Sequence, residues 1–188
     1  MTKNKILVAG ATGNLGLRIC RELRNRGAEV KAIVRHSTDP DKIEAVEKIG
    51  VQIATVDMEN TDAISKECEG VSCVVSAVAG LGDVIVDLQK RILDAAVKAG
   101  VERFVPSDFC TDYNDLNPGE NRNFDFRRTF KEYADQAPIR LRRLRGSMYS
   151  LTDMAKRNSP RNSSTMATIG KAIHHQMPAM MAWCWLAQ

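Results

Sequence analysis

The sequence has no long apolar run. A helix that crosses a membrane needs about 20 consecutive apolar residues, and no stretch of the chain approaches that length. The first apolar run, residues 6–9, is also far too short for the apolar core of a secretion signal. We therefore expect a cytoplasmic protein that makes no contact with a membrane.

Cysteine and histidine are scarce, and neither forms a cluster. The five cysteines are an odd number without paired short spacing: Cys20, Cys68, Cys73, Cys110 and Cys184. Disulfide frameworks and zinc sites need such pairing. The three histidines, His36, His174 and His175, form no triad or ligand set with spaced carboxylates. We expect reduced thiols, no metal site, and histidines that lie on the surface or in the tail.

Acidic residues are almost missing from the last quarter of the chain. Residues 140–188 contain eight Lys and Arg but Asp153 alone, whereas residues 1–139 contain 19 Lys and Arg against 22 Asp and Glu. A basic segment with interspersed aromatics is compatible with nucleic-acid binding, but these arginines share no face of a predicted element. We therefore predict a folded domain over residues 1–139 and a basic, disordered or out-of-frame tail over residues 140–188, and we do not expect nucleic acid as a partner.

Residues 1–139 alternate apolar strands with segments of helical period. The predicted strands are short and rich in Val, Ile or Leu: residues 5–9, 29–34, 51–56, 73–77 and 103–105. The predicted helices are marked by Leu15, Ile19 and Leu23 at i+4 spacing, by the cap Asp39 before Pro40, by a cap at Asn60 or Thr61, by apolar residues from Leu88 to Ala99, and by residues 124–135. The order predicts an α/β fold whose parallel sheet is covered by helices on both faces. No strand or helix is predicted after Arg140.

Three glycines with the spacing G-x-x-G-x-x-G directly follow the first predicted strand: Gly10, Gly13 and Gly16. At this position the first glycine permits the tight turn, the second lets the backbone approach a pyrophosphate, and the third lets the helix pack closely on the sheet. The helix that begins near Leu15 would point its N-terminus at the phosphates, and Thr12 and Asn14 add polar side chains there. The motif predicts a dinucleotide site.

The end of the second predicted strand indicates which dinucleotide is bound. An NAD site usually has an acidic residue there for the ribose 2′-hydroxyl, whereas this chain has Arg35, followed by His36 and Ser37. A guanidinium binds phosphate oxygens with two parallel hydrogen bonds and stays charged at any working pH. We therefore predict NADP(H) as the cofactor.

Several stretches together resemble the NmrA-like and isoflavone-reductase-like proteins, a group of atypical short-chain dehydrogenases. They are residues 5–16, 34–35, 56–58 and 101–109, continued by residues 117–124, and the resemblance fades at Ile139. It covers about three quarters of the chain. The resemblance implies a Rossmann-type, doubly wound parallel sheet, incomplete at its C-terminal end, and an oxidoreductase that uses NADP(H).

The resemblance also implies roles for residues at the ends of the later strands. Asp57 and Met58 would lie beside the adenine. Residues at the end of the fourth strand, Ser76, Ala77 and Val78, would line the phosphate and ribose on the nicotinamide side, and Ser107, Asp108 and Phe109 would border the nicotinamide pocket. One departure is Cys110, where the family usually has glycine.

No catalytic residue is assigned. No Tyr-x-x-x-Lys sequence follows any tyrosine of the chain. Some reductases of the family have a lysine a few residues before an Arg-Arg pair, but here Asn123 and Asp125 precede the pair Arg127 and Arg128. Lys131, after the pair, is expected to be a surface residue of an amphipathic helix.

Two functions remain open at this point. The first is hydride transfer from NADPH to a small organic substrate, such as a quinone or a phenylpropanoid-type compound. Little turnover is expected, because the substrate loops of such proteins come from the C-terminal third, which this sequence lacks in recognisable form. The second is a non-catalytic NADP(H) sensor that binds a protein partner such as a transcription regulator. The absence of both lysine signatures favours the second.

The composition of residues 140–188 leads to a prediction about the reading frame. The only Met codon ends in G, and every Ala codon begins with GC. If the reading frame is shifted so that this G starts a codon, the DNA for Met166-Ala167 must therefore encode Gly, and the DNA for residues 180–182 must encode Asp-Gly. The shifted peptide can resemble the segment that relatives have here. We therefore expect an out-of-frame tail, so that the sheet lacks its later strands and its edge beyond the fifth strand lies open. Sequencing the transcript around codon 140 tests this, and an unbroken family frame that encodes the present tail would contradict it.

Overall fold

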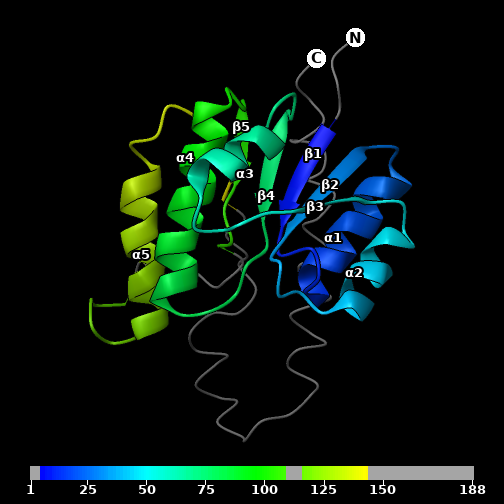
Figure 1. Ribbon diagram of the computed structural model, residues 1–188. Coiled ribbons are helices and arrows are strands. Elements are labelled where there is room, and N and C mark those ends of the chain that lie inside the picture. Colours follow the sequence, from blue (N-terminus) through cyan, green and yellow to red (C-terminus); the bar gives the residue numbers. More distant parts are fainter. Residues whose placement is uncertain (1–4, 109–115, 144–188) are drawn as a thin grey trace, which may run out of the picture.

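A six-stranded parallel sheet forms the centre of the computed structural model, which describes residues 5–108 and 116–143 (Figure 1). Its elements follow one another as β1 (Lys5–Ala9), α1 (Asn14–Asn25), β2 (Glu29–Val34), α2 (Pro40–Glu47), β3 (Gln52–Thr55), α3 (Thr61–Glu67), β4 (Cys73–Ser76), the π-helix η1 (Asp83–Leu88), α4 (Gln89–Lys98), β5 (Arg103–Val105), α5 (Arg122–Ala134) and β6 (Arg140–Leu141).

The strand order is β3-β2-β1-β4-β5-β6, and every neighbouring pair is parallel. The chain starts in the middle of the sheet, builds outward through β2 and β3, and then returns past β1 to build the other half from β4. This is the doubly wound Rossmann order, and the prediction of the fold class is confirmed. In such sheets ligands bind outside the carboxyl ends of the strands where the order reverses, which is here between β1 and β4.

Helices cover both faces of the sheet and create two apolar cores. In Figure 1 the helices α1 and α2 lie on one side of the sheet, and α4 and α5 lie on the other. Because successive strand residues point to opposite faces, Ile6 and Val8 of β1 join the core under α1 and α2, whereas Leu7 and Ala9 join the core under α3, α4 and α5. Burial on both faces explains why the two central strands, β1 and β4, are almost entirely apolar.

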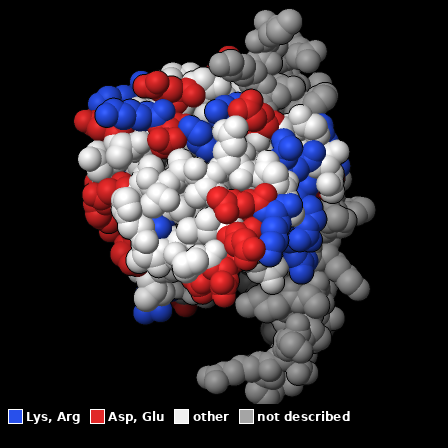
Figure 2. Space-filling model, turned by 45° about the vertical axis from the view of Figure 1, so that its right-hand side comes forward, with Lys and Arg blue, Asp and Glu red and all other residues white. Residues whose placement is uncertain are grey.

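Charged side chains cover the outside of these layers. Figure 2 shows groups of acidic and basic side chains interspersed on one face of the molecule. Several form exposed pairs within or between helices, such as Lys48 with Glu44 at 2.8 Å and Lys98 with Asp62 at 2.7 Å. Exposed pairs contribute little to stability, so the two buried cores hold the fold together.

The strand and helix predictions agree closely with the structure. β1, β2 and β5 have the predicted bounds, and β3 and β4 are shorter by one or two residues. The side chain of Asp39 accepts a hydrogen bond from the Asp41 N–H, and Asn60 rather than Thr61 caps α3 by accepting from Asp62 and Ala63. Local capping chemistry therefore places the helix starts.

Two elements were not predicted. The π-helix η1 precedes α4, and the short strand β6 pairs with β5 through Arg103 with Arg140 and Phe104 with Leu141. The expectation of an open edge beyond the fifth strand was therefore wrong, because β6 covers the start of that edge. The two residues of β6, Arg140 and Leu141, lie directly after the expected domain boundary at residue 139 and belong to the sheet. The rest of the expected tail, residues 144–188, lies outside the described residues.

The buried cysteines carry a testable prediction about thiol reactivity. Burial raises the pKa of Cys20 and of Cys68 to about 12, so almost no reactive thiolate exists at pH 8. We expect both to resist iodoacetamide in the folded protein and to react after denaturation in urea. Peptide mapping by mass spectrometry measures each site separately. Rapid labelling of either residue in the folded state would contradict its placement in the core.

Candidate functional site

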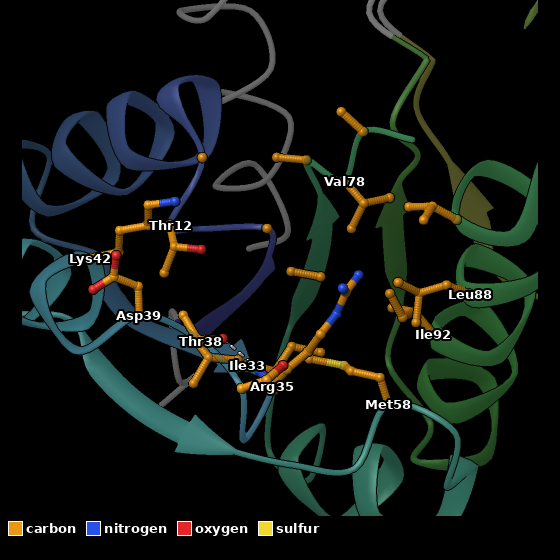
Figure 3. Close-up of a pocket in the computed structure, with 18 residues that line it drawn as sticks. Thr12, Ile33, Arg35, Thr38, Asp39, Lys42, Met58, Val78, Leu88 and Ile92 are labelled. Atoms are coloured by element: carbon orange, nitrogen blue, oxygen red, sulfur yellow. Dashed lines mark hydrogen bonds between the residues drawn. The ribbon is translucent and has the colours of Figure 1, made fainter. Parts of the chain in front are cut away.

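A cavity of about 440 Å³ opens at the carboxyl ends of β1, β2 and β4 (Figure 3). Its wall combines the glycine turn after β1, the segment after β2, and the segment after β4. The predicted site residues that line it are Gly10, Thr12, Gly13, Arg35, Met58, Ala77 and Val78. The structure thus brings together residues that follow four different strands, β1 to β4, at the position where the strand order reverses.

Gly10 and Gly16 are needed for the close approach of backbone segments. Gly10 has φ +81°, and a Cβ on it would lie 2.5 Å from the Ala77 carbonyl oxygen. A Cβ on Gly16 would lie 2.0 Å from the Gly10 carbonyl oxygen. Both contacts are far inside van der Waals distance and involve backbone atoms, so these two glycines hold the turn itself together.

Gly13 differs from the other two. Its backbone is extended, with φ −80° and ψ 163°, and a Cβ there would meet only the Gly10 carbonyl oxygen, at an ordinary 3.4 Å. Gly13 also lines the cavity. A side chain at this position is therefore compatible with the fold but occupies space in the cavity.

This difference predicts that Gly16→Ala destabilises the protein strongly, whereas Gly13→Ala does not. The new methyl group at Gly16 must displace backbone, and overpacking of this kind costs about 3 kcal/mol of unfolding free energy. Urea unfolding followed by circular dichroism measures both variants. Equal unfolding midpoints for Gly16→Ala and the unchanged protein would show that the turn is looser than the structure indicates.

The first turn of α1 faces the cavity without a side-chain cap. Its N-cap residue is Gly13, no side-chain cap hydrogen bond is present among the described residues, and no acidic residue lies in the first turn. The unsatisfied N–H groups and the helix dipole together favour an anion at this end. Asn14 is exposed beside it, whereas Leu15 packs against the first core and Gly16 is buried, so neither of these two lines the cavity.

Arg35 extends from the end of β2 into the cavity in Figure 3. A tight turn fixes its backbone, because Arg35 N–H donates to Thr38 Oγ1 and Thr38 N–H donates to the Arg35 carbonyl, both at 3.1 Å. Among the described residues, no carboxylate pairs with its guanidinium. The charge of Arg35 is therefore available to a ligand.

Lys42 is a second cation in the same cavity, and the sequence analysis missed it. It lies on the first turn of α2, whose cap Asp39 commits its carboxylate to the Asp41 N–H at 3.0 Å. No ion pair joins Lys42 to another described residue. The sequence signal that could have indicated Lys42 is its position shortly after Arg35, at the start of a predicted helix.

A second cavity, of about 450 Å³, adjoins the first and shares Arg35 and Met58 with it. Asp57 lines this second cavity, and its carboxylate accepts from the Glu59 N–H at 2.9 Å. Arg91 on α4 forms an ion pair with Glu59 at 2.6 Å across the outer wall. Asp57 and Met58 therefore lie together, on the side of Arg35 away from the glycine turn.

The remaining predicted residues lie behind the cavity walls. Ser76 is fully buried, and its hydroxyl has no hydrogen-bond partner among the described residues. Ser107 is also buried, and its hydroxyl donates to the Val78 carbonyl at 2.6 Å. Neither lines the two cavities. Phe109 and Cys110 lie outside the described residues.

The Arg127–Arg128 pair and the residues around it lie on α5. Asn123 is exposed in its first turn, and Asp125 pairs with Arg128 at 2.9 Å. Lys131 forms an ion pair with Asp135 at 2.8 Å, one turn further along the helix, and lines neither cavity. These contacts give Lys131 a partner on the surface of its own helix.

Within residues 5–108 and 116–143, no group of three or more His, Cys, Asp or Glu side chains is placed to hold a metal ion. None of the helices in this part of the chain has the length and apolar character needed to cross a membrane.

The sheet order and the glycine turn at its switch point define a Rossmann-type α/β protein. The model of the NmrA-like family matches residues 2–179. The chain belongs to the NmrA-like family.

Similar sequences of known function include plant reductases and synthases. Eugenol synthase 2 of Clarkia breweri is 35% identical over 125 residues, which are 63% of this chain and 40% of that protein. The probable pinoresinol-lariciresinol reductase 3 of Arabidopsis thaliana is 27% identical over 139 residues, which are 73% of this chain and 42% of that protein. The chain thus spans about two fifths of the length of these relatives.

Solved structures of reductases share the fold. The structure of AtPrR2 with NADP⁺ and (+)pinoresinol has a TM-score of 0.68 and 26% identity, with 77% of this chain and 50% of that chain covered. The complex of leucoanthocyanidin reductase with NADPH from Vitis vinifera has a TM-score of 0.66 and 24% identity, with 75% and 49% covered. The second likeness concerns the fold alone.

Proposed function

We propose that this chain binds NADP(H) across the two adjoining cavities and forms the cofactor-binding half of a reductase for a small organic substrate of the phenylpropanoid or quinone type. The observation that carries the proposal is that the glycine turn and the unpaired Arg35 line one cavity. A phosphate-binding turn and a cation at the end of β2 in one cavity suit a dinucleotide with an additional phosphate on its ribose.

The residues present fit this cofactor. Among the described residues, only the Gly10 carbonyl oxygen lies near the Cβ position of Gly13, and no side-chain cap accepts from the first turn of α1. Arg35 and Lys42 supply two positive charges without a carboxylate partner among the described residues. The cavity volumes also lie within the usual range of about 300–1,000 Å³ for small-molecule sites.

Each part of the cofactor has a proposed set of residues. The glycine turn, with Thr12 and Asn14, would hold the pyrophosphate at the N-terminus of α1. Arg35 and Lys42 would hold the 2′-phosphate, and Asp57 and Met58 would border the adenine. Ala77 and Val78 would line the nicotinamide side, with Ser76 and Ser107 behind them.

When bound, NADPH supplies the hydride that a reductase transfers to its substrate. The residues of this chain bind and orient the cofactor and shield one of its sides from water. We assign no proton donor, because Asn123 is exposed and Lys131 is paired with Asp135. The similarity to AtPrR2, whose structure contains NADP⁺ and (+)pinoresinol, supports a phenylpropanoid-type substrate.

The test combines binding and turnover in one preparation of the full chain. Fluorescence titration measures NADPH binding, and stopped-flow absorbance measures NADPH oxidation with a panel of quinones, lignans and propenylphenol esters. Binding with turnover of any member supports a reductase. Binding without turnover supports the sensor alternative, which follows from the missing lysines. Failure to bind NADPH at all would overturn the proposal.

A further inference from the structure

A glutamine side chain is fully buried at the start of α4. Gln89 is 1% exposed and lies among apolar residues of the second core. Burying an amide is costly unless its donor and its acceptor are both hydrogen-bonded. Such a residue within a helix that faces the sheet therefore needs a structural explanation beyond packing.

Both ends of the Gln89 amide are used. Its Nε2 donates to the Ile85 carbonyl at 2.8 Å, and its Oε1 accepts from the backbone N–H of Ser107 at 2.7 Å. The π-helix explains the first bond, because the backbone N–H of Gln89 donates to Val84, five residues earlier. In an α-helix the backbone N–H of Gln89 would donate to the Ile85 carbonyl, four residues earlier. Here the Gln89 side chain donates to that carbonyl instead. Such π-helical turns frequently occur at functional sites.

Ser107 in turn has a partner for each of its three polar groups. Its N–H donates to Gln89, its hydroxyl donates to the Val78 carbonyl, and its carbonyl accepts from the Arg127 guanidinium. Ser107 thus connects the end of β5 with the end of β4, with α4 and with α5. Its hydroxyl proton is already committed to Val78 in this arrangement.

Val78 and Ala77 form the wall of the first cavity between Ser107 and the glycine turn. Val78 lines the cavity, and the Ala77 carbonyl lies where a Cβ on Gly10 would meet it. The backbone after β4 is therefore held on one side by Ser107 and on the other by the turn. A shift of Ser107 would move this wall without touching Arg35.

The strand order indicates which half of a dinucleotide this wall serves. Arg35 ends β2, the glycine turn follows β1, and Val78 follows β4, and the sheet places these strands in the order β2-β1-β4. A cofactor with its 2′-phosphate at Arg35 and its pyrophosphate at the glycine turn must extend its other half toward β4. That half contains the nicotinamide.

We propose that Gln89 is a positioning residue for the nicotinamide half of the site: it fixes Ser107, which fixes the Val78 wall. The inference rests on the proposed function and adds to it a residue that touches no part of the cofactor. A glutamine is needed because it presents a donor and an acceptor at once. Leucine at this position supplies neither, and an ionised glutamate has no donor for the Ile85 carbonyl.

The test compares two ligands in the full chain. NADPH contains the nicotinamide half, whereas adenosine 2′,5′-bisphosphate contains only the half that Arg35 recognises. We expect Gln89→Leu to weaken NADPH binding about tenfold and to diminish the change in nicotinamide fluorescence on binding. Binding of the bisphosphate should change less than about twofold. Equal losses for the two ligands, or no loss for either, would overturn the inference.

A control and a second variant separate positioning from general destabilisation. Leu23→Ala removes packing under α1, in the first core, and should leave the ratio of the two affinities unchanged.

Gln89→Glu tests the need for both a donor and an acceptor. At low pH the neutral carboxyl has both, so this variant should bind NADPH nearly as the unchanged chain does. Its NADPH binding should weaken as the pH rises and the carboxyl loses its proton. An affinity ratio for Gln89→Glu that does not vary with pH would count against the proposal. If the unchanged chain does not bind NADPH, the proposed function fails. If the unchanged chain binds NADPH but Gln89→Leu weakens the binding of both ligands equally or of neither, only this inference fails.

Discussion

Gly13→Val is expected to abolish NADPH binding while the protein stays folded. The Gly13 Cβ position is open, apart from one ordinary contact of 3.4 Å with the Gly10 carbonyl, and it faces the cavity. A branched side chain there would exclude the pyrophosphate from the N–H groups of α1. The loss of two charge-assisted hydrogen bonds corresponds to a weakening of about 100-fold or more.

The stability of the same variant should change little. Valine is a poorer N-cap than glycine, which costs about 1 kcal/mol, and circular dichroism should show nearly unchanged helical content. Calorimetric titration of Gly13→Ala and Gly13→Val should give losses that grow with side-chain size. Full affinity for NADPH in Gly13→Val would mean that the pyrophosphate lies elsewhere, and that the glycine turn serves only the fold.

Arg35→Glu is expected to reverse the preference between the two nicotinamide cofactors. A carboxylate repels a 2′-phosphate but accepts a hydrogen bond from a 2′-hydroxyl. NADPH binding should weaken about 100-fold, from the lost bidentate pair and the new repulsion, whereas NADH binding should change about threefold at most. Parallel calorimetric titrations with NADPH and NADH measure the two constants.

Arg26→Glu is the matched control for Arg35→Glu. Arg26 lies at the opposite end of α1, pairs with Glu22 at 2.8 Å, and lines neither cavity. This variant changes the net charge of the chain by the same amount. A similar loss of NADPH affinity in both variants would indicate a general electrostatic effect and would remove Arg35 from the phosphate site.

Local sequence signals were sufficient to predict the order of the strands and α-helices through α5, but not the π-helix η1. Short runs rich in Val, Ile or Leu predict buried parallel strands. Asp39 and Asn60 place helix starts because their side chains accept hydrogen bonds from N–H groups of the first turn. The glycine motif likewise predicts the turn, because the positive φ of Gly10 and the contact of Gly16 with the Gly10 carbonyl exclude other residues.

Features that depend on tertiary contacts were not predictable in this way. β6 is two residues long and exists because Arg140 and Leu141 pair with β5, so no periodicity marks it. The π-helix η1 ends at Gln89, and the role of this glutamine becomes visible only through its bond to Ser107, 18 positions away. Lys42 resembles any exposed lysine in the sequence, and only the position of α2 shows that it lines the same cavity as Arg35.

The predicted site residues gather at one edge of the sheet, but not all of them line the cavity there. The residues named from the glycine motif and from the strand ends converge on the carboxyl edge of the sheet. Ser76 and Ser107, however, lie behind the wall, because strand-end residues alternate between facing the cavity and facing the core. The sequence alone does not show how β4 is aligned with β1, so it does not indicate which strand-end side chains face the cavity and which face the core.

The central claim is that the edge of the sheet between β2 and β4 is an NADP(H) site with a preference set by Arg35. The most direct measurement is a calorimetric titration of the unchanged chain with NADPH and with NADH at the same ionic strength. The account predicts binding of one NADPH per chain, with an affinity at least about tenfold higher than that for NADH. No binding of NADPH, or equal affinities for the two cofactors, would contradict it.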